Sequence, residues 1–198
     1  KARLVIHGNQ THKYSFDEVK SPTARQEAVK LMMAMMAKRL PGGRKFTGRS
    51  WDVQGAFLQN NIDERTAVKQ SRDSGYVPPQ AIHLRLPDSR YAVLRSYVYG
   101  LKQASYEWYS KLVDVIMGAG FVPTSDLCVF HMWDGQDVII ISVHVDDIFA
   151  IATNDRLHKL MDAALSKAFE GMDAKLTRNV GPKLSYLKMN IEQLEDGT

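Results

Sequence analysis

Three stretches of the chain place apolar residues at helical spacing. The first follows Ser21 and Pro22, where a serine can cap free amides and a proline fits the first helical turn, so we expect a helix to begin there. Its apolar positions are Ala24, Ala28, Leu31, Met32, Met35 and Met36. A second helix is expected over residues 105–117, and a third behind a cap at Asn154 or Asp155. Their apolar stripes are Tyr109, Leu112, Val113, Ile116 and Met117, and Leu157, Leu160, Met161, Ala164, Leu165 and Ala168.

Other apolar runs have the length of strands. They cover residues 1–7, 47–58 with a break at Gly55, 138–145, 148–152 and 186–191. Only Asp146 and Asp147 separate the third and fourth runs, which predicts a hairpin with these two residues as its loop. This mixture, with few β-α-β units, predicts an α+β fold in which helices cover one face of an antiparallel sheet.

Composition narrows the class of protein only slightly. The 198 residues suit one domain or two joined subdomains, and 44% apolar and 24% charged residues are ordinary for a globular protein. A net charge of +4 is compatible with a nucleic-acid partner but does not require one. The single cysteine, Cys128, excludes an internal disulfide, and no Cys/His cluster indicates zinc. No run of about 18 apolar residues indicates a membrane span, and the start without Met leads us to expect part of a longer protein.

The predicted hairpin loop is chemically unusual. A two-residue loop favours Asn-Gly or Asp-Gly, whereas neighbouring aspartates repel each other and are costly beside a buried hairpin unless cations lie there. Strand alternation places Ser142, His144 and Asp146 on one face, with Asp147 on the other face or in the turn. Aspartate is also common in ordinary turns, so this segment alone leaves a polar turn and a cation site open.

A second acidic residue favours the cation site. Asp52 lies in the apolar segment WDVQGAFL of residues 51–58. Two-metal sites for phosphoryl transfer need several carboxylates that converge from separate strands, and Mg²⁺ prefers such oxygen ligands. The sequence therefore favours a metal-dependent reaction on phosphate groups.

With these segments in view, the chain resembles the reverse transcriptases of copia-type retrotransposons. The most specific similarities are DVQGAFL at residues 52–58 to the family's DVKTAFL, YGLKQA at 99–104 to YGLKQAPRAWY, and VDDI at 145–148 to the end of YVDDI. Further similar segments are KARLV at 1–5, SPTAR at 21–25 to SPVAR, LSKAFE at 165–170 to LSKRFE, and YLKMNI at 186–191 to YFLGIEI. These segments follow the family's order and cover nearly the whole chain.

The resemblance implies a right-hand polymerase fold. It assigns residues 1–46 and 64–98 to the fingers, and residues 47–63 and 99–198 to a palm whose antiparallel sheet is backed by helices, with the thumb absent. It implies an RNA-directed and DNA-directed DNA polymerase that adds deoxynucleotides to a primer by two-metal nucleotidyl transfer. Trp108 and Tyr109 are interpreted as core residues of the palm helix.

The resemblance also implies roles for individual residues. Asp52, Asp146 and Asp147 would be catalytic and, together with Val53, would hold two Mg²⁺ ions, with Mn²⁺ as the alternative. Nucleotide binding is implied for Val53, Gln54, Gly55, Ala56, Phe57, Tyr99, Gly100, Lys102, Lys1 and Arg3, and primer binding for His144, Val145, Leu187, Lys188 and Met189. Phe57 resembles the ring that rejects a ribose 2′-hydroxyl, although a core aromatic fits the pattern too. Plain surface charges remain the alternative interpretation of Lys102, Lys1 and Arg3.

Three residues depart from the family pattern. His144 stands in place of Tyr, Ser105 in place of Pro and Lys188 in place of Gly. Ser105 removes the fixed φ of proline and so loosens the turn before the helix. Lys188 adds a side chain where the family's glycine would let the backbone approach the primer closely. These departures keep a second hypothesis open, a decayed polymerase-like relic that at most binds nucleic acid. A two-metal nuclease is a third hypothesis, disfavoured by YGLKQA and the primer-grip-like segment.

The resemblance finally implies partners and a location. The partners are an RNA or DNA template, a DNA or RNA primer, deoxynucleoside triphosphates, and the thumb and RNase H segments of the same polyprotein. No membrane partner is expected. The implied location is intracellular, in the cytoplasm and within a virus-like particle.

Overall fold

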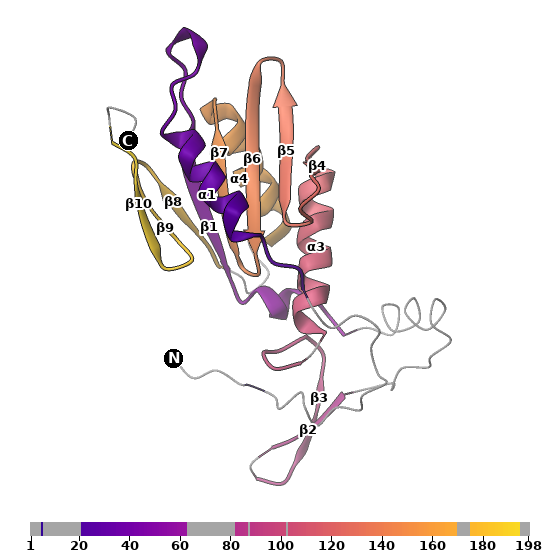
Figure 1. Ribbon diagram of the computed structural model, residues 1–198. Helices are drawn as coiled ribbons and strands as arrows, with labels where there is room; N and C mark the ends of the chain where they lie inside the picture. Colours follow the sequence, from indigo (N-terminus) through magenta and orange to yellow (C-terminus); the bar gives the residue numbers. More distant parts are fainter. Residues whose placement is uncertain are drawn as a thin grey trace. The chain divides into compact units, whose positions relative to one another are not determined.

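The computed structural model describes residue 5 and residues 21–62, 82–86, 88–101, 103–169 and 175–194 (Figure 1). The chain divides into two compact units. One unit comprises Lys1–Ser21 and Gly55–Trp108, and the other comprises Pro22–Gln54 and Tyr109–Thr198. The assignment of segments to fingers and palm stays a prediction.

The larger unit is built on a six-stranded sheet. Its strands, in spatial order, are β4 Val122–Pro123, β5 Val129–Asp134, β6 Asp137–His144, β7 Asp147–Ala152, β1 Thr47–Gln54 and β8 Lys175–Val180. Every neighbouring pair is antiparallel. The predicted α+β fold with an antiparallel sheet is therefore confirmed. Strand β8, whose sequence KLTRNV carries little apolar alternation, was not predicted.

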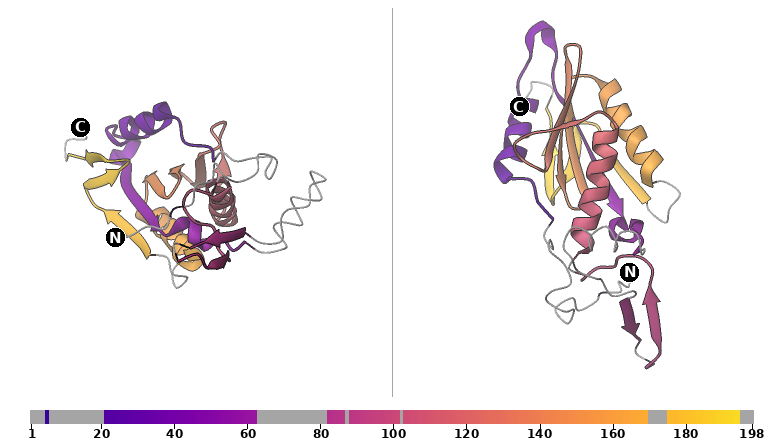
Figure 2. Two further views of the ribbon diagram at one scale, coloured as in Figure 1. Left: turned by 90° about the horizontal axis from the view of Figure 1, so that it is seen from below. Right: turned by 90° about the vertical axis from the view of Figure 1, so that its right-hand side faces the viewer.

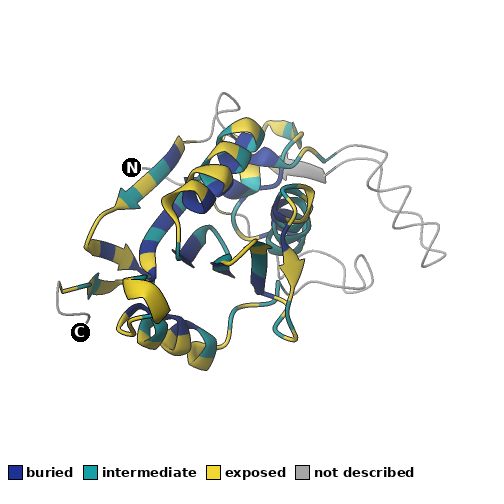
Figure 3. Ribbon diagram, turned by 90° about the horizontal axis from the view of Figure 1, so that it is seen from above, coloured by how far each residue is buried: buried dark blue, intermediate teal, exposed yellow. Residues whose placement is uncertain are grey.

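Helices lie on both faces of this sheet, so the expectation that they cover one face was wrong. Helix α1 Gln26–Met36 and helix α4 Asp155–Phe169 lie on opposite sides (Figure 2). The apolar residues of β7 explain this arrangement, because Phe149 and Ile151 are fully buried on the α1 side while Ile148 and Ala150 are fully buried on the other. Both helices turn their buried residues inward (Figure 3).

Helix α1 begins later than predicted. It starts at Gln26 rather than at Ser21-Pro22, and Arg25 before it is extended, with φ −66° and ψ 139°. The backbone amide of Arg25 donates to an Asp126 carboxylate oxygen at 3.2 Å. A tertiary contact therefore satisfies the backbone amide of the residue that precedes the helix. Leu31, predicted to belong to the apolar stripe, is 62% exposed. A short 3-10 turn, η2 Pro41–Gly43, follows the helix.

The other predicted helices are confirmed with small shifts. Helix α3 spans Ala104–Gly118, and its Leu112 and Ile116 are fully buried, although Met117 is half exposed. The Asn154 side chain accepts a 2.9 Å bond from the Arg156 amide, which caps α4 as predicted. Leu160 of the α4 stripe is 39% exposed, a further correction.

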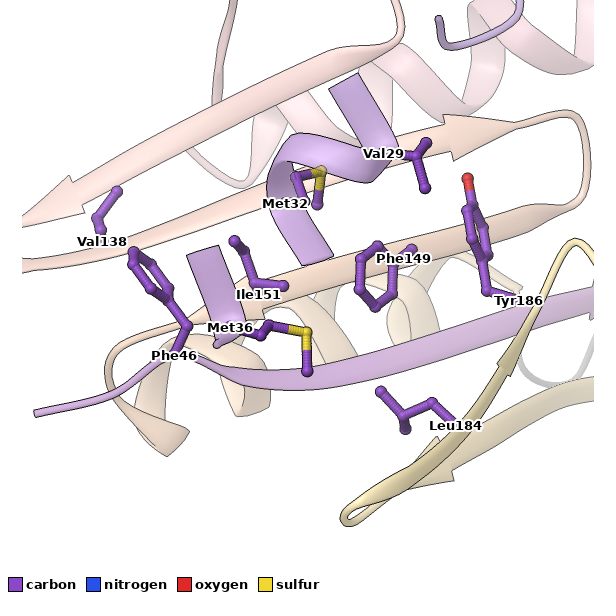
Figure 4. Packing of buried hydrophobic residues seen from close by; sticks show 9 residues of the cluster. All are labelled: Val29, Met32, Met36, Phe46, Val138, Phe149, Ile151, Leu184 and Tyr186. Carbon is purple, nitrogen blue, oxygen red and sulfur yellow. The ribbon is translucent and has the colours of Figure 1, made fainter. Parts of the chain in front are cut away.

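The core on the α1 side joins distant segments. Residues of α1, β6, β7 and the later strand β9 pack together (Figure 4). The cluster contains Val29, Met32, Met36, Phe46, Val138, Phe149, Ile151, Leu184 and Tyr186. The four methionines of this stretch, Met32, Met33, Met35 and Met36, all belong to the cluster or pack against it, and are therefore core side chains.

Two small hairpins complete the described elements. In the larger unit, β9 Lys183–Tyr186 pairs with β10 Met189–Glu192. The prediction of one strand over residues 186–191 was wrong, because Leu187 and Lys188 form a turn between two strands. In the smaller unit, β2 Ile82–Arg85 pairs with β3 Tyr91–Leu94, and the 3-10 turn η3 is Ala56–Gln59.

Candidate active site

The β6–β7 hairpin turns one residue earlier than predicted. His144 pairs with Asp147, so the two loop residues are Val145 and Asp146, and Asp147 is already the first residue of β7. The alternation prediction was therefore wrong for both aspartates: Asp147 shares a face with His144, and Asp146 lies in the turn. Val145 has φ 57°, a left-handed value that is uncommon for a β-branched residue. Such backbone strain is concentrated at functional sites.

The register of β1 brings Asp52 to the same place. Asp52 is the direct partner of Asp147 across the β1–β7 pair, and directly opposed residues project to the same face of a sheet. The Val53 amide donates a 3.1 Å bond to the Asp146 carbonyl, which fastens the end of β1 to the turn. We call His144, Asp147, Asp52 and Thr177 the carboxylate row, because they are consecutive cross-strand partners on one face.

The aspartates of this site repel one another. Burial raises the pKa of Asp147 above its ordinary value, and the negative charges of Asp146 and Asp52 raise it further, while His144 has the opposite effect. A carboxylate in this position is therefore more costly to ionise than a free one. A cation near the three aspartates would remove that cost.

The donor set fits a divalent cation of the magnesium type. Such ions take hard oxygen ligands and leave positions for water and phosphate, which suits aspartates on two adjacent strands and a turn. Among the residues that the structure describes, no three His, Cys, Asp or Glu side chains already form a closed ligand cluster.

The segment after β1 has the backbone expected for close approach of a ligand. Gly55 has φ 76°, in the left-handed region that favours glycine, and the chain then enters η3. The Gln54 side-chain amide donates to Thr177 Oγ1 at 3.1 Å and fixes the last residue of β1 against β8. Ala56 is buried.

Phe57 and Tyr99 form an aromatic pair in the smaller unit. Their ring centroids are 4.8 Å apart at 58°, and Phe57 also packs on a cluster of Tyr97, Val98 and Leu101. The ring of Phe57 is half-buried, so a core role and a role at a ligand are both compatible with this packing. Gly100 has φ 94°, which explains a glycine at that position.

Three of the predicted nucleotide-binding residues, Lys1, Arg3 and Lys102, lie outside the described residues. Trp108 is fully buried, as expected of a core residue. Tyr109 is half-buried, and its hydroxyl donates to the Leu127 carbonyl at 2.6 Å. The interpretation of Trp108 as a core side chain is confirmed.

The predicted primer-binding residues at the chain's end form a tight turn. Leu187 and Lys188 have φ of 49° and 63°, the pattern of a two-residue hairpin loop of type I′. This conformation explains why a glycine is favoured where Lys188 stands. Ser185 and Tyr186, directly before the turn, contact the main sheet through Ser50, Ser142 and Phe149. Ser50 was missed because nothing in the sequence distinguishes it from any strand serine.

An antiparallel sheet that carries aspartates of two adjacent strands on one face, with a third aspartate in a neighbouring hairpin turn, is the class of domain expected for metal-dependent chemistry on phosphates. Comparison with known proteins makes this class specific. Residues 1–198 match the family model of reverse transcriptase (RNA-dependent DNA polymerase), and the chain belongs to this family. The match supports a DNA polymerase role at the level of the family.

Relatives from plant transposons agree with this assignment. The chain is 32% identical over 171 residues to the retrovirus-related Pol polyprotein from transposon RE2, and 32% over 177 residues to that from RE1, both of Arabidopsis thaliana. It is 27% identical over 194 residues to the Pol polyprotein from transposon TNT 1-94 of Nicotiana tabacum. These alignments cover 85%, 87% and 96% of this chain but only 11%, 11% and 13% of the relatives. The resemblance to copia-type reverse transcriptases is confirmed.

Proposed function

We propose that this chain is the polymerase segment of a retrotransposon polyprotein and extends a primer on an RNA or DNA template. The observation that carries the proposal is the direct cross-strand pairing of Asp52 with Asp147, beside a turn that contains Asp146. In the reaction, the primer 3′-hydroxyl oxygen bonds to the α-phosphorus of a deoxynucleoside triphosphate. The bond from the α-phosphorus to the oxygen that it shares with the β-phosphate breaks, the hydroxyl proton passes to solvent water, and pyrophosphate leaves.

Asp52, Asp146 and Asp147 would hold two Mg²⁺ ions, or Mn²⁺, with Val53 contributing from the end of β1. When bound, the ions would lower the pKa of the primer hydroxyl and neutralise charge on the leaving pyrophosphate. The raised pKa of Asp147 supports this assignment, because the clustered carboxylates favour a positive counterion. The two carboxylates of β1 and β7 would also fix the spacing of the reacting groups.

The nucleotide would contact the segment after β1. Backbone amides of Val53, Gln54, Gly55 and Ala56 would face its phosphates, and the left-handed Gly55 supports a close approach. Phe57 would exclude a ribose 2′-hydroxyl. Tyr99 and Gly100, together with Lys102, Lys1 and Arg3, would complete the nucleotide contacts.

The primer end would lie between the two hairpin turns. His144 and Val145 would contact it from the β6–β7 side, and Leu187, Lys188 and Met189 from the β9–β10 side. Met189 is 40% exposed, which leaves it accessible. Lys188 adopts the left-handed conformation with its side chain present, so this turn forms without the family's glycine.

The remaining partners follow from the family. A template strand and the thumb and RNase H segments of the same polyprotein would accompany the chain, which spans about an eighth or less of the curated relatives that it matches. Within the described residues, no helix is long and apolar enough to cross a membrane. We propose an intracellular site of action, in the cytoplasm and inside a virus-like particle.

Primer extension on an RNA template tests the proposal, using both this chain and the longer polyprotein that contains it. Asp146→Asn should lower extension by on the order of 100-fold or more, the scale seen when one electrostatic group is lost from a transition state. Asp137→Asn is the matched control, because Asp137 lies at the opposite end of β6 and pairs with Arg44. Equal signals from wild type and Asp146→Asn would exclude the polymerase, and degradation of the template without deoxynucleotides would indicate a nuclease instead.

A further inference from the structure

A second row of side chains lies directly beside the carboxylate row. The row crosses strands β6, β7, β1 and β8. Its members, in that order, are the cross-strand partners Ser142, Phe149, Ser50 and Asn179. Each lies two positions along its strand from a member of the carboxylate row, so both rows project to the same face of the sheet. Any segment fastened to this second row is held at a fixed distance from the aspartates.

The β9–β10 hairpin is fastened there by Ser50. The Ser50 hydroxyl donates to the Ser185 carbonyl at 2.9 Å and accepts from the Asn179 side chain at 3.2 Å. Ser50 is only 2% exposed, so water does not compete for these bonds. The hairpin is thereby joined to the strand that carries Asp52.

The next residue of the hairpin, Tyr186, makes a second attachment. Its ring stacks on Phe149 with centroids 5.2 Å apart and an angle of 28° (Figure 4). Its hydroxyl oxygen lies 3.5 Å from Ser142 Oγ, a long hydrogen bond, so the stacked rings are the stronger contact. Burial and the nearby Asp147 carboxylate raise the pKa of Tyr186 to about 12. The stacking places Tyr186 on Phe149, two positions along β7 from Asp147 of the carboxylate row.

The hairpin needs these attachments because it is not part of the main sheet. Strands β9 and β10 form a separate two-stranded sheet, and an isolated hairpin of this kind is marginally stable by itself. Its turn, Leu187 and Lys188, follows Tyr186 directly. Side-chain contacts in the second row therefore help to hold the turn relative to Asp52 and Asp147, together with the buried Leu184 and the bonds from the Gln193 side chain to the Met36 and Phe46 carbonyls.

We propose that Tyr186 and Ser50 are positioning residues for nucleotidyl transfer, which set the distance between the primer-holding turn and the metal-holding aspartates. This inference rests on the proposed function. Neither side chain would touch the reacting atoms. Their effect follows from geometry, because a displacement of about 1 Å at a reacting group costs on the order of 100-fold in rate.

The test compares variants of both residues in single-turnover primer extension by the polyprotein. Tyr186→Leu removes the stacked ring and should lower the rate at saturating nucleotide by about 10-fold, with the nucleotide KM unchanged. Tyr186→Phe keeps the ring and should restore the rate to within about 2-fold of wild type. Ser50→Ala removes one attachment with little loss of volume and should lower the rate by about 3-fold. This variant provides the test if Tyr186→Leu does not fold.

Phe130→Leu is the matched control for Tyr186→Leu. Phe130 is a buried ring on β5 that lies outside the hairpin's core cluster, so its loss should lower stability without slowing extension. Amide hydrogen exchange should be faster over residues 183–192 in Tyr186→Leu than in Phe130→Leu. If wild type extends primers and the two Leu variants behave alike, the inference is wrong while the proposed function stands. If wild type extends no primer and Asp146→Asn matches it, the function fails, and the inference with it.

Discussion

Asp147 is the residue at which stability and proposed function are most opposed. Its raised pKa arises first from burial and then from Asp146 and Asp52. A raised pKa means that the folded protein binds this proton more tightly than the unfolded chain does. The associated stability is therefore present at low pH and is lost as pH rises through the folded pKa. At neutral pH the ionised side chain weakens the fold, as expected for a group retained for function.

Asp147→Asn should consequently raise the melting temperature by a few degrees at pH 7 without divalent ions, while lowering primer extension. The amide keeps the shape of the side chain and removes its charge. Asp155→Asn is the matched control of opposite sign, because a hydrogen bond from Lys159 lowers the pKa of Asp155. That control should lower the melting temperature. A less stable Asp147→Asn protein would show that repulsion among the aspartates is not significant.

His158 supplies a pH dependence of stability away from the site. It is 1% exposed, its Nε2 lies 2.9 Å from the Thr47 carbonyl, and burial lowers its pKa to about 4. Arg49 lowers this pKa further, whereas Asp155 raises it. Because the unfolded chain takes up the proton near pH 6.5, stability is complete above that value and falls as pH drops to about 4.

The loss attributable to His158 over this window should be on the order of 3 kcal/mol. Urea unfolding from pH 7 to pH 4 measures it, and subtraction of the same series for His158→Gln isolates the histidine from other titrating groups. Equal pH slopes for the two proteins would contradict the prediction.

At the scale of elements, the sequence motifs were easier to predict than the pairing registers of the strands that carry them. The β6 and β7 runs are apolar on both faces, so alternation could not show whether the turn holds Val145 or Asp147. The cross-strand register of β6 and β7, with His144 opposite Asp147, decided it, and a sequence pattern does not contain that register. The start of α1 was misjudged for a similar reason, since a contact with Asp126 outweighs the local capping signal at Ser21.

The β9–β10 turn gives a prediction about backbone strain. Lys188→Gly should stabilise the protein by about 1 kcal/mol, because a left-handed residue with a side chain costs roughly that amount. Thermal melting measures the change. Asn190→Gly in the adjacent strand is the control and should destabilise, since glycine there only adds freedom to the unfolded chain. Destabilisation by both changes would show that the Lys188 side chain makes contacts that outweigh its strain.

At the scale of the whole molecule, the family could be predicted from the order of its motifs. The placement of Asp52 and Asp147 on one face of the sheet could not be predicted in this way. Asp52 and Asp147 lie on neighbouring strands although they are distant in sequence, and only the folded sheet brings them together. Folding and cation binding should therefore be linked, because the unfolded chain does not hold this set of carboxylates.

Mg²⁺ or Mn²⁺ should accordingly raise the melting temperature, and a chelator should reverse the rise. At a concentration ten times the dissociation constant, binding to the folded state alone stabilises by about 1.4 kcal/mol. Asp52→Asn removes one proposed ligand and should abolish the rise, whereas Asp137→Asn, at the far end of β6, should retain it. The measurement needs neither primer nor nucleotide, so it reports on the carboxylates even in a protein that does not polymerise. An equal rise in all three proteins would assign the effect to nonspecific surface binding and remove the metal site from the proposal.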